Sequence, residues 1–146
     1  MLHSYFLWKS IISIHTIALA IWIGSLFFHA FCLPSCLKLL DQTQRNSVQL
    51  QSLQKLFSLN WITIFLSVVC QAFLSSLYPI NASIWINYIP LTLIILMTLL
   101  QVYTFVKPYQ QVRRTIRPKS TQFEKIYNYF KLIVVLGLIS IIFSSL

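Results

Sequence analysis

The sequence predicts an all-α fold, an integral membrane four-helix bundle formed by a single domain over residues 1–146. Three observations support this prediction. Hydrophobic residues make up 58% of the chain, and charged residues only 9%. Four apolar stretches match the roughly 20 helical residues that span a hydrocarbon core about 30 Å thick. The charged residues gather between these stretches, as is typical of membrane proteins rather than of soluble domains.

The first transmembrane helix is expected over residues 10–33, after an aromatic-rich lead-in suited to the membrane interface. Pro34 marks its expected end or a kink. The stretch is longer than the apolar part of a signal peptide and lacks a convincing cleavage site, so we expect it to be retained. His15, Trp22 and His29 follow one another at every seventh residue and therefore share one stripe of this helix.

The other three helices follow in chain order. Residues 35–56 are polar and Gln-rich, and we expect them to form an interfacial or protruding helix before the second span at 57–77. The third span is expected at 84–106, with Pro90 in its first two turns, where a missing backbone N–H costs little. A basic segment separates it from the fourth span, which is expected at 126–144.

The basic residues predict the orientation of the bundle. Of the 11 lysines and arginines, all except Lys9 lie in or beside the loops that follow the first and third spans. The positive-inside rule therefore predicts two basic cytoplasmic loops and both termini outside. This topology suits a bacterial inner membrane, in which both termini would be periplasmic. The same topology explains the net charge of +9, so that we expect membrane lipid as a partner and no nucleic acid.

Polar residues inside the predicted spans define where a site can lie. The second span carries a polar stripe whose members are spaced three or four residues apart: Asn60, Thr63, Ser67, Gln71 and Ser75. We expect this stripe to face neighbouring helices, because polar side chains are costly in lipid. Both acidic residues, Asp41 and Glu124, lie outside the spans, which argues against carboxylate-driven transport or hydrolysis.

His15 is the first candidate ligand. A rise of about 1.5 Å per residue places it about 9 Å below the outer membrane edge, roughly level with Cys70 and Gln71 on the second span. An imidazole at this depth can bind a haem iron or Cu(I), with Cys70 or Gln71 as a further ligand or as a hydrogen-bonding partner. The alternative is a histidine that packs against Gln71 or a backbone carbonyl and binds nothing.

A second candidate metal site lies at the expected end of the first span. If the helix continues past Pro34, His29, Cys32 and Cys36 lie on one side of it, and an imidazole with two thiolates suits Cu(I) or zinc. Pro34 disturbs that geometry, and a free cysteine is often only a buried apolar residue. With Cys70 the chain has three cysteines, so we expect no disulfide framework.

The first helix also carries a recognisable motif. His15 is followed after six residues by Trp22-Ile23-Gly24, then by aromatic residues and by Pro34. This pattern resembles the CopD-like superfamily of small four-helix membrane proteins, which includes copper-resistance D domains and the HemJ-type protoporphyrinogen oxidases. The resemblance implies that His15 binds haem or copper.

Two further features of the chain bear on this resemblance. Lys107-Pro108 at the end of the third span and the aromatic segment 123–130 also look similar to the superfamily. Several relatives have a histidine in a later helix, however, where this chain has Tyr127 and Tyr129. The spacing of the two first-helix histidines is also similar to that of b-type cytochromes, but two bis-histidine haems would require a dimer or another subunit.

These observations predict an inner-membrane protein that binds or transfers haem b or Cu(I), with no catalytic residue. The expected ligands begin with His15, and the secondary candidates are His29, Gln71, Cys32, Cys36 and Cys70. One alternative is a structural or accessory subunit of a larger membrane complex that binds no cofactor, as a homodimer or with other membrane subunits. The second alternative is a HemJ-like protoporphyrinogen oxidase.

The predicted orientation can be tested with reporter fusions. Alkaline phosphatase fused after Leu146 is expected to be active, because the enzyme folds only outside the cytoplasm, whereas the same reporter fused after Arg117 is expected to be inactive. A fluorescent protein that folds only in the cytoplasm should give the reverse pattern. Activity of the phosphatase at Arg117 would contradict the orientation.

Overall fold

The computed structural model describes residues 2–77 and 84–144. Every regular element in this part of the chain is helical. The α-helices are α1 (Leu2–Phe27), α2 (Leu33–Cys36), α3 (Gln42–Leu77), α4 (Ile84–Thr104), α5 (Gln110–Arg114) and α6 (Ser120–Ser144). The all-α fold is confirmed, and it contains four helical stretches that are long and apolar enough to cross a membrane.

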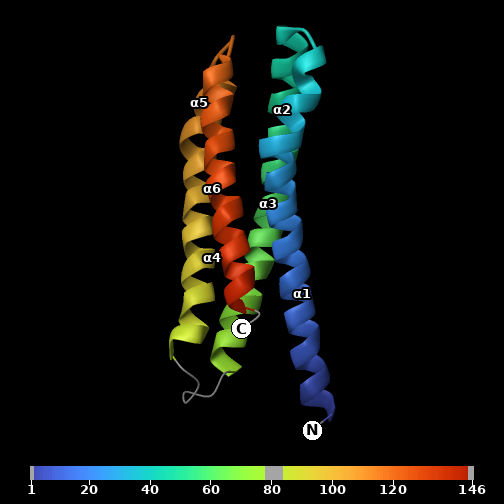
Figure 1. Ribbon diagram of the computed structural model, residues 1–146, viewed down its shortest axis with the longest axis vertical. Coiled ribbons are helices and arrows are strands. Elements are labelled where there is room, and N and C mark those ends of the chain that lie inside the picture. Colours follow the sequence, from blue (N-terminus) through green and yellow to red (C-terminus); the bar gives the residue numbers. More distant parts are fainter. Residues whose placement is uncertain (1, 78–83, 145–146) are drawn as a thin grey trace.

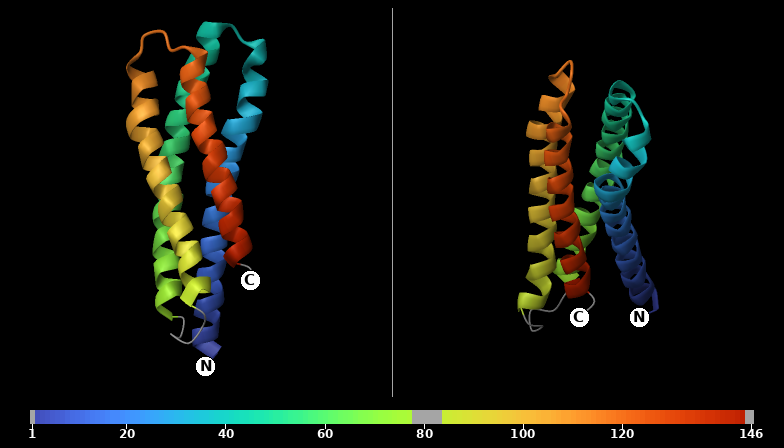
Figure 2. Two further views of the ribbon diagram at one scale, coloured as in Figure 1. Left: turned by 60° about the vertical axis from the view of Figure 1, so that its left-hand side comes forward. Right: turned by 45° about the horizontal axis from the view of Figure 1, so that its top comes forward.

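The long helices α1, α3, α4 and α6 pack as an antiparallel bundle (Figure 1). α1 packs along α3 and α4 packs along α6, while α1 also contacts α6 and α3 contacts α4, so that the two pairs close into a ring. Figure 2 shows the connections from α2 to α3 and from α5 to α6 at one end of the bundle, and both chain ends toward the other. The two basic segments of the sequence therefore meet at one end, which we call the basic end.

Two π-helical turns, Phe28–Cys32 and Phe105–Tyr109, connect α1 to α2 and α4 to α5. Each lies at a proline: Pro34 is in the first turn of α2, and Pro108 is inside the second π turn. Proline lacks a donor and crowds the preceding helical turn, and a wider turn accommodates that loss. The helical path therefore continues past Pro34, which deforms the first helix without ending it.

The spans expected at 10–33, 57–77, 84–106 and 126–144 are all shorter than the helical paths in the structure. α3 and α6 begin earlier than expected, and the paths of α1 and α4 continue through the π turns to Cys36 and Arg114. α3 begins at Gln42 and runs for 36 residues, so the Gln-rich segment is the first part of α3 rather than a separate helix. Leu53 and Leu56 in that segment are buried in the core. Hydropathy detects only the apolar part of a helix, whereas Gln, Leu and Lys favour its continuation. The expected ends at Leu77 and Ile84 agree, and the turn between them lies outside the described residues.

Large apolar side chains cover the outside of the bundle as well as its interior. Ile62 and Phe65 on α3 are 68% and 71% exposed, and Leu99 on α4 is 62% exposed. A helix that is apolar on every face belongs in a protein core or a membrane. Since these faces lie on the outside, the bundle is that of an integral membrane protein with lipid around it.

Gly137 on α6 lies at a close contact between helices. A Cβ atom added there would lie 2.6 Å from Ile23 Cδ1 on α1 and 3.1 Å from Met97 Cε on α4. Ile23 and Met97 are both buried, so neither side chain has free space beside it. Gly24 on α1 provides a control position, because a Cβ atom added there meets nothing within 4 Å.

We expect Gly137→Ala to lower the free energy of unfolding by about 1–3 kcal/mol, because the added methyl group overpacks this contact. Gly24→Ala should leave stability unchanged or raise it by up to about 1 kcal/mol, since alanine is the better helix former. Unfolding by SDS titration in detergent micelles, followed by circular dichroism, measures both changes. Equal effects at the two glycines would show that α6 is not closely packed at Gly137.

Candidate functional site

His15 lies on the face of α1 that packs against α3, and its side chain is only 5% exposed. The ring is within hydrogen-bonding reach of the backbone of Ser67 on α3. Its Nδ1 atom is buried and has no hydrogen-bond partner in the described part of the chain. His15 therefore presents a nitrogen to the interior of the bundle without a protein group to satisfy it.

The polar stripe of α3 faces inward, as the sequence predicts. Four of its five members are buried, and Ser75 is half-buried; the buried ones are Asn60, Thr63, Ser67 and Gln71. The Ser25 hydroxyl of α1 shares its one proton between Asn60 Oδ1, at 2.9 Å, and the carbonyl of Trp22, at 2.8 Å. The Thr63 hydroxyl donates to the Asn60 carbonyl over 3.0 Å. The stripe is thus the polar contact surface between α3 and α1.

Gln71 belongs to this stripe and Cys70 lies directly before it in the chain, and both are 8% exposed. They follow Ser67 by three and four residues, which is about one helical turn or 6 Å along α3. The His15 ring lies near the backbone of Ser67. His15 is therefore about one helical turn away from Cys70 and Gln71, with which the sequence predicted it to be level. Counting residues along straight, parallel helices cannot include their tilt, which explains a displacement of this size.

His29 lies further along the first helical path and is half-buried. Its Nδ1 atom is 2.9 Å from the carbonyl oxygen of Ser25, and because a carbonyl only accepts, Nδ1 carries the proton of the neutral ring. The Nε2 atom is then the acceptor, and it is buried without a hydrogen-bond partner in the described chain, near the backbone of Ser52. His29 therefore faces α3 at a separate position from His15.

The expected cluster of His29, Cys32 and Cys36 does not form in this structure. Across the described residues, no three histidine, cysteine or acidic side chains lie close enough together to hold a metal ion. Cys32 is half-buried and Cys36 is exposed, and both are free thiols. The reason is local: the π turn at Phe28–Cys32 changes the rotation per residue, and the His29 ring turns back to Ser25.

Several other buried polar side chains also lack a hydrogen-bond partner. Side-chain atoms without a hydrogen-bond partner among the described residues also occur at Trp22, Asn60, Ser67, Gln101, Tyr127 and Ser140. Each such group costs about 1–3 kcal/mol when it is left unpaired in a protein interior. The seven-residue spacing of His15 and Trp22 predicted that they share a face, and both are buried. Gln101 on α4 and Ser140 on α6, polar positions of the third and fourth predicted spans, are also buried, at 0% and 1% exposed.

Haem and Cu(I) make different demands on this site. Haem needs a wide planar slot beside the axial histidine, but the face of α1 that carries His15 also carries Leu19 and Trp22, which are 2% and 0% exposed. Cu(I) is small and is bound by imidazole and thiolate ligands. The free Nδ1 of His15 and the buried thiol of Cys70 beside the polar stripe of α3 provide one group of each kind. The donor set therefore fits Cu(I) better than haem.

The chain matches no protein-family model, no curated protein and no solved structure. The resemblance of the first helix to the CopD-like superfamily thus remains a prediction from its motif, and the candidate site is supported by the geometry of His15 and α3.

We expect Ser25→Ala to lower the free energy of unfolding by about 1 kcal/mol, because it removes the hydroxyl that contacts the Asn60 side chain across the two helices. Ser13→Ala is the matched control on the same helix, since Ser13 is exposed and its hydroxyl bonds only the carbonyl of Lys9, over 2.9 Å. SDS titration in micelles compares the two variants. A loss at Ser13 equal to that at Ser25 would show that the bond to Asn60 contributes nothing.

Proposed function

We propose that this chain is a membrane protein that binds and passes on Cu(I) through His15, with both termini outside and both basic loops in the cytoplasm. In the bacterial inner membrane that this topology suits, the termini and the nearby end of the site would be periplasmic. Haem is the other ligand that the first-helix motif implies, but the buried face around His15 favours Cu(I), which is much smaller.

The observation that carries the proposal is the buried Nδ1 atom of His15, which no described protein group satisfies. A neutral imidazole nitrogen with a free lone pair is a good ligand for Cu(I). The ring lies near the backbone of Ser67, which would orient it as a second partner does for a metal-binding histidine.

Cys70 is the proposed second ligand, because its thiol is free and buried beside the polar stripe of α3. Binding would release the thiol proton, since the thiolate is the form that coordinates a metal. Gln71 follows Cys70 directly and would hydrogen-bond either ligand from the side. Bound Cu(I) would supply a centre with few ligands, from which the ion can be passed to another protein by ligand exchange.

A second candidate function is that of an accessory subunit in a larger membrane complex. One observation favours it: the described chain holds no group of three metal ligands, so a more stable site would need ligands from another chain. In that case His15 would pack against the backbone of Ser67 as a structural residue. An oxidase function has less support, because Asp41 and Glu124 are both exposed and no acid–base pair lies beside His15.

The test is to purify the chain in mild detergent under reducing conditions, supply Cu(I), and measure bound copper and the visible spectrum. We expect copper near one ion per chain without a Soret band. His15→Ala and Cys70→Ser should each weaken binding by about tenfold or more in competition with a chromophoric Cu(I) chelator, as losing a ligand does. Cys36→Ser, which removes an exposed thiol, should bind as the wild type does.

Three other results would decide between the alternatives. A Soret band that disappears in His15→Ala would replace copper by haem as the ligand. Equal weakening by Cys36→Ser and Cys70→Ser would show that copper binds to accessible thiols, and the proposed site would be wrong. A colourless, copper-free protein that purifies with other subunits would support the accessory function instead.

A further inference from the structure

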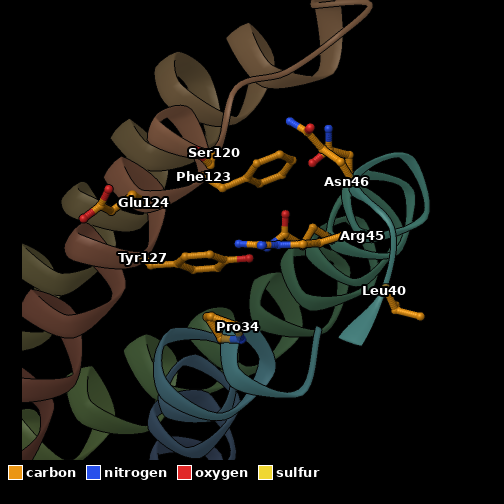
Figure 3. Close-up of a pocket in the computed structure, with 10 residues that line it drawn as sticks. Pro34, Leu40, Arg45, Asn46, Ser120, Phe123, Glu124 and Tyr127 are labelled. Atoms are coloured by element: carbon orange, nitrogen blue, oxygen red, sulfur yellow. The ribbon is translucent and has the colours of Figure 1, made fainter. Parts of the chain in front are cut away.

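A cavity of about 440 Å³ lies at the basic end of the bundle, between the first turns of α3 and α6. Figure 3 shows Phe123 and Tyr127 of α6 reaching toward α3, and Arg45 of α3 reaching toward them. It lies far along the bundle from His15, at the opposite end of α3 from Cys70. Whatever occupies it does not depend on the copper proposal.

Tyr127 points an unpaired hydroxyl into this region. Its side chain is only 6% exposed, and the hydroxyl makes no hydrogen bond of good geometry within the described chain, although Gln49 lies beside it. Gln49 is itself 2% exposed and lines the cavity. Figure 3 shows the Tyr127 hydroxyl directed at the Arg45 side chain. Two buried donors and a guanidinium thus converge in one place.

The positive charge of Arg45 is not neutralised by a carboxylate. The chain has only two acidic residues, and Arg45 forms no ion pair among the described residues. Glu124 lines the cavity, but Figure 3 shows its carboxylate directed away from Arg45, and Asp41 is exposed. Arg45 therefore faces this cavity without a carboxylate partner among the described residues.

Two long helices begin beside this cavity. α3 begins at Gln42 and α6 begins at Ser120, both of which line the cavity. The first N–H groups of a helix have no partner within it, and the helix dipole makes this end positive. Asp41 directly precedes α3, and its carbonyl accepts a hydrogen bond from the Arg45 N–H, whereas α6 has no acidic residue in its first turn. The start of α6 is therefore the end that favours an anion.

The neighbouring loop is held against α3 and brings more positive charge. Asn46 donates a hydrogen bond to the carbonyl of Pro118 over 3.1 Å. Next to this bond lies a second concave region, lined by Arg117 and Lys119 and sharing Gln42 and Asn46 with the first. Two further cations therefore line the region that adjoins the cavity.

We propose that this cavity binds a phosphoryl anion, held by Arg45, Tyr127 and Gln49 between the two helix ends. A guanidinium binds phosphate through paired hydrogen bonds, and the tyrosine hydroxyl and glutamine amide supply the further donors that phosphate oxygens accept. The phosphoryl group can belong to an anionic lipid headgroup, since the cavity lies at the end of the membrane-spanning bundle, or to a small soluble phosphate.

The test uses the full chain in nanodiscs of phosphatidylcholine, with and without phosphatidic acid, and in detergent with inorganic phosphate. Native mass spectrometry and thermal unfolding report binding. We expect at least one probe to bind and to raise the unfolding temperature. Tyr127→Phe and Arg45→Lys should each weaken this binding by about tenfold, because each removes a charge-assisted hydrogen bond while keeping most of the side chain.

Arg113→Lys is the matched control, since Arg113 is exposed on α5 and does not line the cavity. It should bind as the wild type does, and circular dichroism should confirm that every variant is folded. Binding of phosphatidic acid without inorganic phosphate assigns the lipid headgroup, and competition by inorganic phosphate assigns the small anion. If neither probe binds, or if Arg113→Lys weakens binding as much as Arg45→Lys does, the proposed site is wrong.

Discussion

A polar side chain that faces lipid has no water to hydrogen-bond, and this cost determines which side of α3 turns inward. Asn60, Ser67 and Gln71 are all buried on that side. α1 supplies the groups that meet it, the Ser25 hydroxyl and the His15 ring. The contact of α1 with α3 is therefore polar on the inside, and the copper proposal depends on the same contact because it is what buries His15.

The remainder of the bundle is closed mainly by aromatic and aliphatic packing. The Phe57 ring of α3 lies 4.9 Å from that of Tyr109 and 6.0 Å from that of Phe130, measured between ring centroids. This cluster joins α3 to the π turn after α4 and to α6. The two proposed sites lie toward opposite ends of the bundle and differ in chemistry. The copper site would use the imidazole of His15 and the thiol of Cys70 inside the apolar part, whereas the anion site would use Arg45 and Tyr127 at the basic end.

The sequence predicted the four helices and the inward stripe of α3, because hydropathy and helical periodicity are local properties of the chain. It left open whether Pro34 ends the first helix or only kinks it, because the π turn that lets the helix continue has no sequence pattern of its own. It placed His15 about one helical turn from its neighbour Ser67 on α3. The difference arises because helix tilt depends on the whole bundle and not on the local sequence. The meeting of Arg45 with Tyr127 could not be predicted, because the two belong to helices that are distant in the chain.

The pairing of α1 with α3, and of α4 with α6, has a consequence for biogenesis. Each pair is consecutive in the chain, so each emerges from the ribosome as a helical hairpin that can enter the bilayer as a unit. The first hairpin carries its own polar contact, the bond from Ser25 to Asn60, and can form before the second is made. The second hairpin then docks through apolar packing and the bond from Asn46 to Pro118. Such a chain is assembled in the order in which it is translated, and a ribosome that stalls halfway leaves a paired hairpin in the membrane rather than a single unpartnered helix.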